Sequence, residues 1–173
     1  DLPWWTTLND WFSVEDGLVT ILTWTPGTFN PTLRRFDAGT GKEVSATRFA
    51  GRPEAFTVTA DAVWVTAETE PRVWRLDVAA GEVATVEWGG LDTGPITFAY
   101  GSIWLGDVRE NTLTRLDPAT GEGLATIQIA EPQPPGRAGP PYPFFATAPH
   151  LTGLVADDTA LWAQIGGAPG NVI

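Results

Sequence analysis

An arginine, a large apolar residue and an aspartate recur in that order three times, at intervals of forty residues. The triplets begin at Arg35, Arg75 and Arg115, and a glycine follows each aspartate four residues later. Self-similarity at a fixed period of this length indicates one small supersecondary unit repeated along the chain. The period therefore favours stacked modules over a single irregular domain.

A second motif, built around a tryptophan, recurs ahead of the triplets. Asp61–Val65 is matched by Gly101–Leu105 forty residues later, and by Thr159–Ala163 after a further 58 residues. In the first module, Asp16–Thr20 matches Asp61–Val65 at a spacing of 45. We therefore expect five extra residues between Ile21 and Leu33.

Each module is predicted to contain four short strands, because short apolar runs alternate with turn-forming residues. In the third module we expect strands at Ile96 to Tyr100, Ser102 to Gly106, Thr112 to Asp117 and Gly123 to Ile129. The triplet aspartates are interpreted as turn formers, since aspartate accepts a hydrogen bond from the backbone two residues ahead. The glycines that follow, Gly41, Gly81 and Gly121, are expected to supply the positive φ that closes each turn.

Four-stranded repeats of this length predict an all-β fold, a β-propeller in which each sheet is a blade. Gly101–Gly106, followed by Asn111–Glu122, resembles a blade of the YVTN-type propeller repeats. Pro149–Trp162 is similar to a blade of the virginiamycin B lyase-like propellers. The resemblance implies a ring of seven blades.

The expected organisation is three complete four-stranded blades and the two inner strands of a fourth, which stops as its third strand begins. The predicted boundaries are an N-terminal extension at 1–9, blades at 10–51, 52–90 and 91–130, a proline-rich insertion at 131–149, and the incomplete blade at 150–173. An incomplete blade exposes an unpaired edge and an apolar face. Three explanations stay open: a piece of a longer protein, two copies that together close a seven-bladed ring, or an open fragment.

Composition excludes several classes of function. A formal net charge of −11, with only ten Lys and Arg residues, repels nucleic acid and anionic membranes. Without cysteine there is no disulfide, thiol nucleophile or thiolate metal site. No apolar run is long enough to span a bilayer as a helix. Asp1 suggests a product of cleavage or cloning, and with the resemblance it favours an extracellular, periplasmic or cell-surface location.

His150 is the single histidine, so zinc sites built on several His or Cys ligands are excluded within this sequence. The resemblance to virginiamycin B lyase implies magnesium-dependent elimination on a cyclic depsipeptide, with a histidine base, for which His150 is a weak candidate. Leu151-Thr152-Gly153 departs from that pattern, and the further catalytic residues of the family are not in the sequence. An ordinary polar residue at a strand entrance is the favoured interpretation.

Trp64, Trp104 and Trp162 share one repeat position and are expected to pack between neighbouring blades. Trp4, Trp5, Trp24, Trp74 and Trp88 fall outside the repeat. Trp24 is the best candidate among them for an exposed aromatic.

Two departures from regular spacing are expected to lie on one rim of the ring, since the second-to-third loops and the inter-blade links emerge at the same end. The first is the loop from Thr23 to Thr32, which carries Trp24 and Phe29. The second is the proline-rich insertion, a candidate docking segment through Arg137, Tyr142, Phe144 and Phe145. The alternative is that Phe144 and Phe145 cap the blade interface.

The same rim is predicted to carry Glu68, Glu70, Asp107, Arg109 and Glu110. Such an acidic surface would attract a basic partner or a cation, and carboxylate oxygens are the ligands that calcium and magnesium prefer. The sequence therefore favours a non-catalytic module that binds a protein or small molecule through this rim. The alternatives are part of a lyase-like enzyme and a structural subunit that completes a propeller with another chain.

Overall fold

The computed structural model describes residues 12–23, 31–68, 70–132, 150–166 and 171–172. These residues form β-strands joined by turns and links, and contain no helix that could cross a membrane. The strands are β1 (Phe12–Glu15), β2 (Leu18–Thr23), β3 (Thr32–Asp37), β4 (Glu43–Arg48), β5 (Pro53–Val58), β6 (Ala62–Ala67), β7 (Val73–Asp77), β8 (Val83–Val86), β9 (Thr93–Ala99), β10 (Ser102–Asp107), β11 (Thr112–Leu116), β12 (Gly123–Gln128), β13 (His150–Ala156), β14 (Leu161–Gly166) and β15 (Asn171–Val172). The all-β prediction is confirmed.

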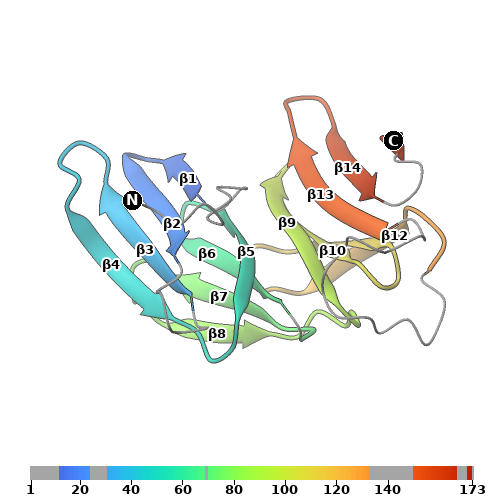
Figure 1. The fold of residues 1–173 in the computed structure, drawn as a ribbon, viewed down its shortest axis with the longest axis horizontal. Coiled ribbons are helices and arrows are strands. Elements are labelled where there is room, and N and C mark those ends of the chain that lie inside the picture. The colour runs from blue at the N-terminus through green and yellow to red at the C-terminus, as the bar shows by residue number, and fades with distance from the viewer. Residues whose placement is uncertain (1–11, 24–30, 69, 133–149, 167–170, 173) are drawn as a thin grey trace.

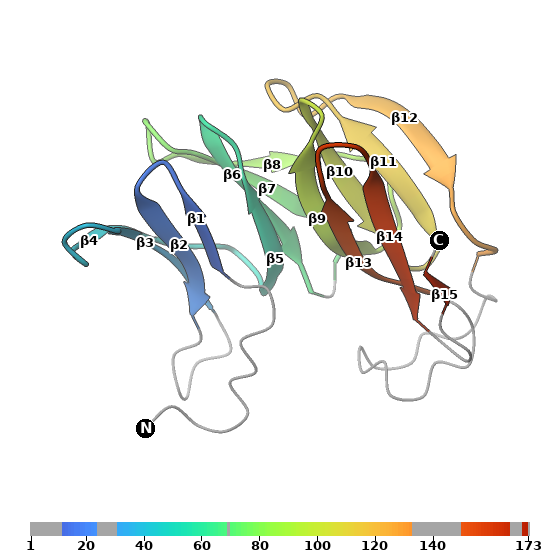
Figure 2. The same ribbon diagram turned by 90° about the horizontal axis from the view of Figure 1, so that it is seen from above.

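The strands pair in sequence order into antiparallel sheets, which are the blades. Blade 1 is β1 to β4, blade 2 is β5 to β8, blade 3 is β9 to β12, and blade 4 is β13 to β15. Figure 1 shows the blades side by side in an arc, with the first strands β1, β5, β9 and β13 on its inner side. Figure 2 shows blades 1 and 4 at opposite ends of the arc. The chain thus has the fold of part of a propeller, and the described third strand of blade 4 is Asn171–Val172.

The turn between the third and fourth strands of each complete blade is built by its aspartate, as predicted. Asp117 Oδ1 accepts hydrogen bonds from the backbone N–H groups of Ala119 and Thr120, at 2.8 and 2.9 Å. Asp37 and Asp77 make the equivalent bonds in the two preceding blades. The glycines that close the turns have φ of +68°, +72° and +77°. The repeated triplet is therefore a turn signal.

Strand register corrects the expected spacing in blade 1. Leu18 pairs with Asp37 as Ala62 pairs with Asp77, so β2 aligns with β6 at an offset of 44 residues rather than 45. The loop after β2 therefore has four extra residues instead of five, and Thr20 occupies the place of Trp64. The predicted spacing was one residue too long because the aspartate of the Asp16-Gly17 turn was matched to Asp61 of blade 2. Asp16 and Gly17 form a tight turn between β1 and β2, with φ of +50° and +74°.

Thr152, which seemed to interrupt the blade 4 pattern, is the extra residue of a β-bulge between Leu151 and Gly153. Register shifts of the same kind occur near the start of β5 and of β9. A bulge bends the strand and increases its twist. It is therefore a recurrent feature of the inner strands rather than a departure confined to blade 4.

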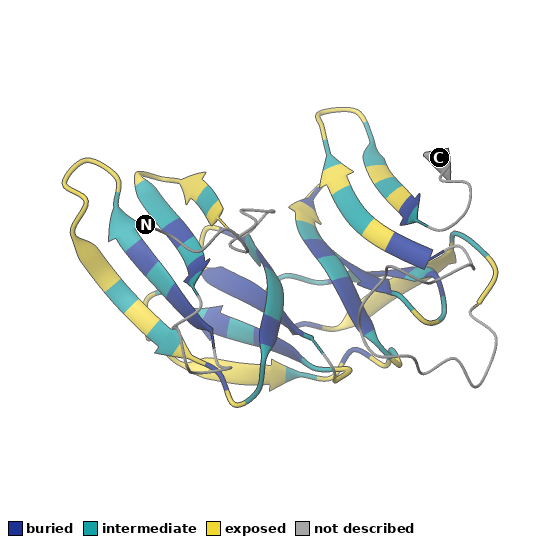
Figure 3. Ribbon diagram, viewed as in Figure 1, coloured by how far each residue is buried: buried dark blue, intermediate teal, exposed yellow. Residues whose placement is uncertain are grey.

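Apolar side chains fill the space between neighbouring blades. Leu22 and Leu33 of blade 1 pack with Phe56, Val63 and Val65 of blade 2. On the opposite face of blade 2, other side chains pack against blade 3. Each four-stranded blade presents one face to each neighbour, and Figure 3 shows burial concentrated in the middle of the arc.

The tryptophans only partly follow expectation. Trp64 is fully buried between blades 2 and 3, as predicted, and Trp104 is half-buried. Trp162 is exposed, which corrects the prediction that it packs between blades, because no further blade covers that face of blade 4 among the described residues. Trp74 and Trp88, which lie outside the sequence repeat, are buried in the blade interfaces.

Candidate functional site

The two ends of the blades differ in construction. One end, which we call the turn rim, consists of tight turns such as Asp117–Gly121. The other, which we call the loop rim, consists of the loops after the second strands and the links between blades. Its described segments are residues 50–52, 68, 70–72, 88–92, 108–111 and 129–132. The strand ends that bound 24–30 and 133–149 also lie at the loop rim.

Asp107 organises the part of the loop rim between blades 2 and 3. Its Oδ1 accepts backbone N–H groups of Arg109 and Glu110, each at 2.9 Å, and shapes the loop after β10. Its Oδ2 accepts the N–H groups of Leu91 and Asp92, at 2.7 and 3.4 Å, and fixes the link into blade 3. One carboxylate therefore holds a loop and an inter-blade link together.

Other polar side chains extend this pattern along the rim. The Thr93 hydroxyl donates a hydrogen bond to the backbone carbonyl of Ala67. The backbone carbonyl oxygen of Glu70 also lies 3.1 Å from this hydroxyl. Arg72 Nη1 donates to the carbonyl of Ala50 at 2.7 Å, which joins a blade 2 loop to the link from blade 1. Side chains from blades 2 and 3 thus fix the described rim segments to one another.

Asn111 is the corresponding residue between blades 3 and 4. It is fully buried, with φ of +52°, and its Nδ2 donates to the carbonyl of Glu131 at 2.6 Å. Its Oδ1 accepts the N–H of Leu151, at 3.1 Å, in the first strand of blade 4. Gln128 Nε2 donates to the carbonyls of Glu110 and Ala130, both at 2.6 Å.

Carboxylates gather where blades 2 and 3 meet at this rim. Burial, together with the charges of Glu68 and Asp92, raises the pKa of Glu54 to about 7. Burial and the charge of Asp107 also raise the pKa of Asp92. Burial is the larger cause of both raised pKa values, and neighbouring carboxylates add to it.

Two ion pairs lie beside these carboxylates. Arg52 Nη2 is 2.7 Å from Glu68 Oε2, and Arg72 Nη2 is 2.8 Å from Glu70 Oε2. Their members are partly exposed, so each pair contributes little to stability. Glu70 and Arg72 form the more exposed of the two pairs.

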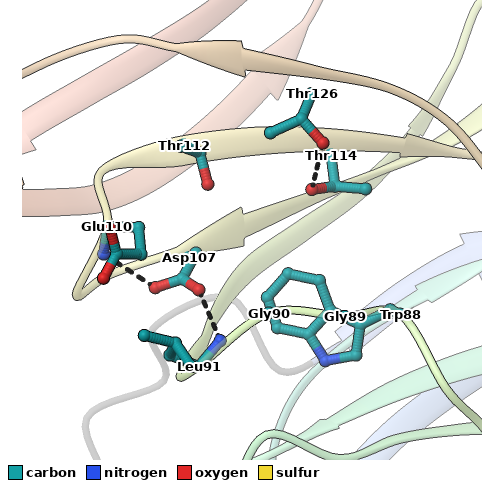
Figure 4. Close-up of a pocket in the computed structure, with 9 residues that line it drawn as sticks. All are labelled: Trp88, Gly89, Gly90, Leu91, Asp107, Glu110, Thr112, Thr114 and Thr126. Atoms are coloured by element: carbon teal, nitrogen blue, oxygen red, sulfur yellow. Dashed lines mark hydrogen bonds between the residues drawn. The ribbon is translucent and has the colours of Figure 1, made fainter.

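A pocket of about 230 Å³ adjoins the loop rim between the link into blade 3 and the outer strands of that blade. Figure 4 shows the Trp88 indole on one side, Thr112 and Thr114 on another, and Asp107 and Glu110 at the rim end. The Thr114 and Thr126 hydroxyls lie 3.3 Å apart and hydrogen-bond to each other. The pocket therefore offers hydroxyl and carboxylate groups beside one aromatic ring.

The structure places some of the site residues predicted from the sequence on the loop rim, and others lie outside the described residues. Glu68, Glu70, Arg109 and Glu110 lie together on the loop rim and are at least partly exposed. Asp107 also lies there, but it is buried and bonded to four backbone N–H groups, so the expected exposed acidic surface lacks this member. The other predicted residues, Trp24, Phe29, Arg137, Tyr142, Phe144 and Phe145, lie outside the described residues.

Sequence reasoning did not single out Glu54, Asp92 or Asn111. Each lies at or next to an inter-blade junction, where an inner strand begins or a loop turns back. A glutamate just after the start of an otherwise apolar inner strand was the available signal for Glu54. For Asn111, the signal was an asparagine in a turn position, since asparagine tolerates positive φ.

His150 opens β13, opposite Gly166, and is largely buried. Within the described ranges, no three His, Asp or Glu side chains come together in a group that could hold a metal ion. The role of His150 as a base stays a prediction that rests on resemblance.

No family model and no curated protein sequence matches the chain. Solved structures do match its fold. BamB from Moraxella catarrhalis has a TM-score of 0.65 at 19% identity, over 93% of this chain and 40% of BamB. The computationally designed protein Ika4 has a TM-score of 0.64 at 15% identity, over 94% of this chain and 86% of Ika4.

A second designed protein, Ika8, has a TM-score of 0.61 at 14% identity, over 93% of this chain and 43% of Ika8. The chain therefore spans less than half the length of BamB and of Ika8. Identities this low carry information on fold alone. The chain has the fold of a partial β-propeller, similar to BamB and to the designed propellers.

Proposed function

We propose that the chain is a non-catalytic interaction module that binds a protein partner through its loop rim. The observation that carries the proposal is the network of Asp107, Thr93, Arg72 and Asn111, whose side chains fix loops and links of neighbouring blades to one another. Such bonds pre-organise a surface and reduce the entropy that binding must overcome. Recognition residues on rigid scaffolds are commonly carried by loops of this kind.

The charge of this surface favours a partner segment rich in arginine or lysine. Glu54 and Asp92 have raised pKa values because they are partly buried and lie near other negative groups. An incoming cation would relieve that repulsion and stabilise the ionised carboxylates. The pocket between Trp88 and Glu110 is positioned to take one side chain of such a segment.

A matched pair of variants tests the proposal. Glu70→Gln/Glu110→Gln neutralises two loop-rim carboxylates, and Glu82→Gln/Glu122→Gln neutralises two on the turn rim. The probe is a synthetic arginine-rich peptide, titrated calorimetrically at about 0.15 M salt. We expect the loop-rim variant to bind at least about tenfold more weakly than the turn-rim variant. Equal losses would mean that only net charge attracts the peptide and would refute the proposal.

Two finer assignments belong to the same proposal. Membership in the YVTN-type or virginiamycin B lyase-like repeats is supported by the residues of blade 3 and by the aspartate turns. An extracellular, periplasmic or cell-surface location rests mostly on that resemblance. Detection of the protein outside the cytoplasm of the producing cell is the test, and recovery only from the cytoplasm would contradict it.

A further inference from the structure

Strand register assigns each blade one face toward the preceding blade and one toward the following blade. In blade 2, Val63 and Val65 pack on blade 1, whereas Ala62 and Trp64 pack on blade 3. Blade 1 has no described neighbour on its preceding side, and blade 4 has none on its following side (Figures 1 and 2). The two ends of the arc therefore expose faces of opposite type.

The exposed face of blade 1 carries the same residue types as the face of blade 2 that blade 1 covers. Phe12 pairs with Ile21 as Phe56 pairs with Val65, and Val14 occupies the position of Val58. Phe56 and Val58 are 8% and 7% exposed, because blade 1 covers them, whereas Phe12 and Val14 are both 59% exposed. Blade 1 thus retains the residues that its neighbour uses to pack on a preceding blade.

Blade 4 shows the complementary case. Trp162 pairs with Val155 as Trp64 pairs with Thr57. Trp64 is fully buried against blade 3, whereas Trp162 and Val155 are 45% and 64% exposed. Leu151 and Ile165, on the opposite face of blade 4, are buried against blade 3. The exposed side chains therefore lie on the face that would meet a following blade.

An existing contact shows how two such faces meet. The backbone N–H of Phe98 in blade 3 donates to Thr57 Oγ1 in blade 2 at 3.0 Å. By register, Val155 is equivalent to Thr57, and Val14 is equivalent to Phe98. The same packing between blade 4 of one chain and blade 1 of another would place the Val155 side chain beside the backbone of Val14, without that hydrogen bond, because valine has no hydroxyl.

We propose that a second copy of this chain covers both open faces, with blade 4 of each copy packed head to tail on blade 1 of the other. The aligned part of this chain matches about two fifths of BamB and of Ika8. Two copies thus supply most of the length of such a propeller. Two identical head-to-tail contacts close a two-fold ring and leave no apolar face exposed. This inference is independent of the loop rim.

The experiment uses the 173-residue chain. Sedimentation equilibrium is expected to give a dimer, about twice the mass of one chain. Val14→Lys and Val155→Glu each place an unpaired charge in both contacts of the ring, where the equivalent residues Phe98 and Thr57 are partly exposed, so each is expected to raise the dimer dissociation constant at least about tenfold. Leu124→Glu, which adds a charge at an exposed residue of β12 away from both faces, is the matched control and should leave the dimer unchanged.

Mixing the Val14→Lys and Val155→Glu variants distinguishes the head-to-tail ring from a contact between two fourth blades. In the mixed dimer, one contact is wild type and the other joins the introduced lysine to the introduced glutamate, so association is expected to recover and to weaken with added salt. Recovery would also show that both variants fold. A monomeric wild-type chain, or mixing without recovery, would overturn the proposal. So would a dimer sensitive only to Val155→Glu, which would indicate a contact between two fourth blades.

Discussion

Trp64 in blade 2 and Trp162 in blade 4 occupy the same position of the repeat but have different surroundings. Trp64 is fully buried between two blades, whereas Trp162 is 45% exposed and donates its indole N–H to Asp157 Oδ2 at 3.1 Å. The same contrast separates Phe56 and Val58 from Phe12 and Val14. In a fold built from stacked sheets, the neighbouring blade decides burial, and the residue type only permits it.

The largest expected difference follows from this pair of tryptophans. Trp64→Ala should lower the free energy of unfolding by about 3 to 5 kcal/mol, because it leaves a cavity between two blades. Trp162→Ala should cost about 1 kcal/mol or less in the isolated chain, since much of the ring is already in water. Urea unfolding at a concentration low enough to keep the chain monomeric measures both. Equal losses would show that blade 4 is already covered.

The contrast also shows how far sequence reasoning reached. The forty-residue period predicted the blades, and Asp37, Asp77 and Asp117 predicted the turns, because both signals depend on local backbone chemistry. The exposure of Trp162 was missed because burial depends on a neighbour that the repeat does not specify. The burial of Trp88 was also not predicted. Trp88 fills a space between two blades, but it matches no repeated motif in the sequence.

The start of the inner strand gives a second comparison. Glu54 in blade 2 and Thr152 in blade 4 both lie in bulge regions, but among the residues that the structure describes only the blade of Glu54 is followed by another blade. The pKa of Glu54 is raised from 4.5 to about 7, so its contribution to stability is complete below about pH 4.5 and is lost as the pH rises through 7. The protein should therefore lose stability over this range on account of Glu54.

Glu54→Gln should remove that loss and stabilise the chain by about 1 to 3 kcal/mol at pH 8, with little effect at pH 4.5. Thr152→Gln is the control at the exposed bulge and should change neither value. Thermal unfolding across this pH range is the measurement. A Glu54→Gln profile parallel to wild type would show that this carboxyl is not desolvated at the blade junction.

The smallest expected difference compares two turn glycines. Gly81 and Gly121 share positive φ, so alanine at either position should cost about 1 kcal/mol of stability. An added Cβ at Gly121 would lie 2.7 Å from Val86 Cγ1 in the preceding blade, whereas at Gly81 it meets nothing within 4 Å. Gly121→Ala should therefore cost about 1 kcal/mol more than Gly81→Ala in chemical unfolding. Equal costs would show that this turn does not pack on blade 2.

Site prediction from sequence was more limited than fold prediction. Glu68, Glu70, Arg109 and Glu110 could be assigned to one rim, since loop order in a meander of four strands determines which loops emerge together. The structural role of Asp107 could not, because its hydrogen bonds to Leu91 and Asp92 depend on how two blades meet. Long-range contacts of this kind leave no periodic signal in the sequence.

Hydroxyl-radical footprinting, read by mass spectrometry at single tryptophans, tests most directly whether the chain is an arc with open faces that a second copy covers. In dilute solution we expect rapid oxidation of Trp162 and strong protection of Trp64. As the concentration rises through the dimer dissociation constant, Trp162 should become protected while Trp64 stays unchanged. Equal oxidation of the two residues in dilute solution would contradict the arc, and a Trp162 that stays reactive at high concentration would contradict its coverage by another chain.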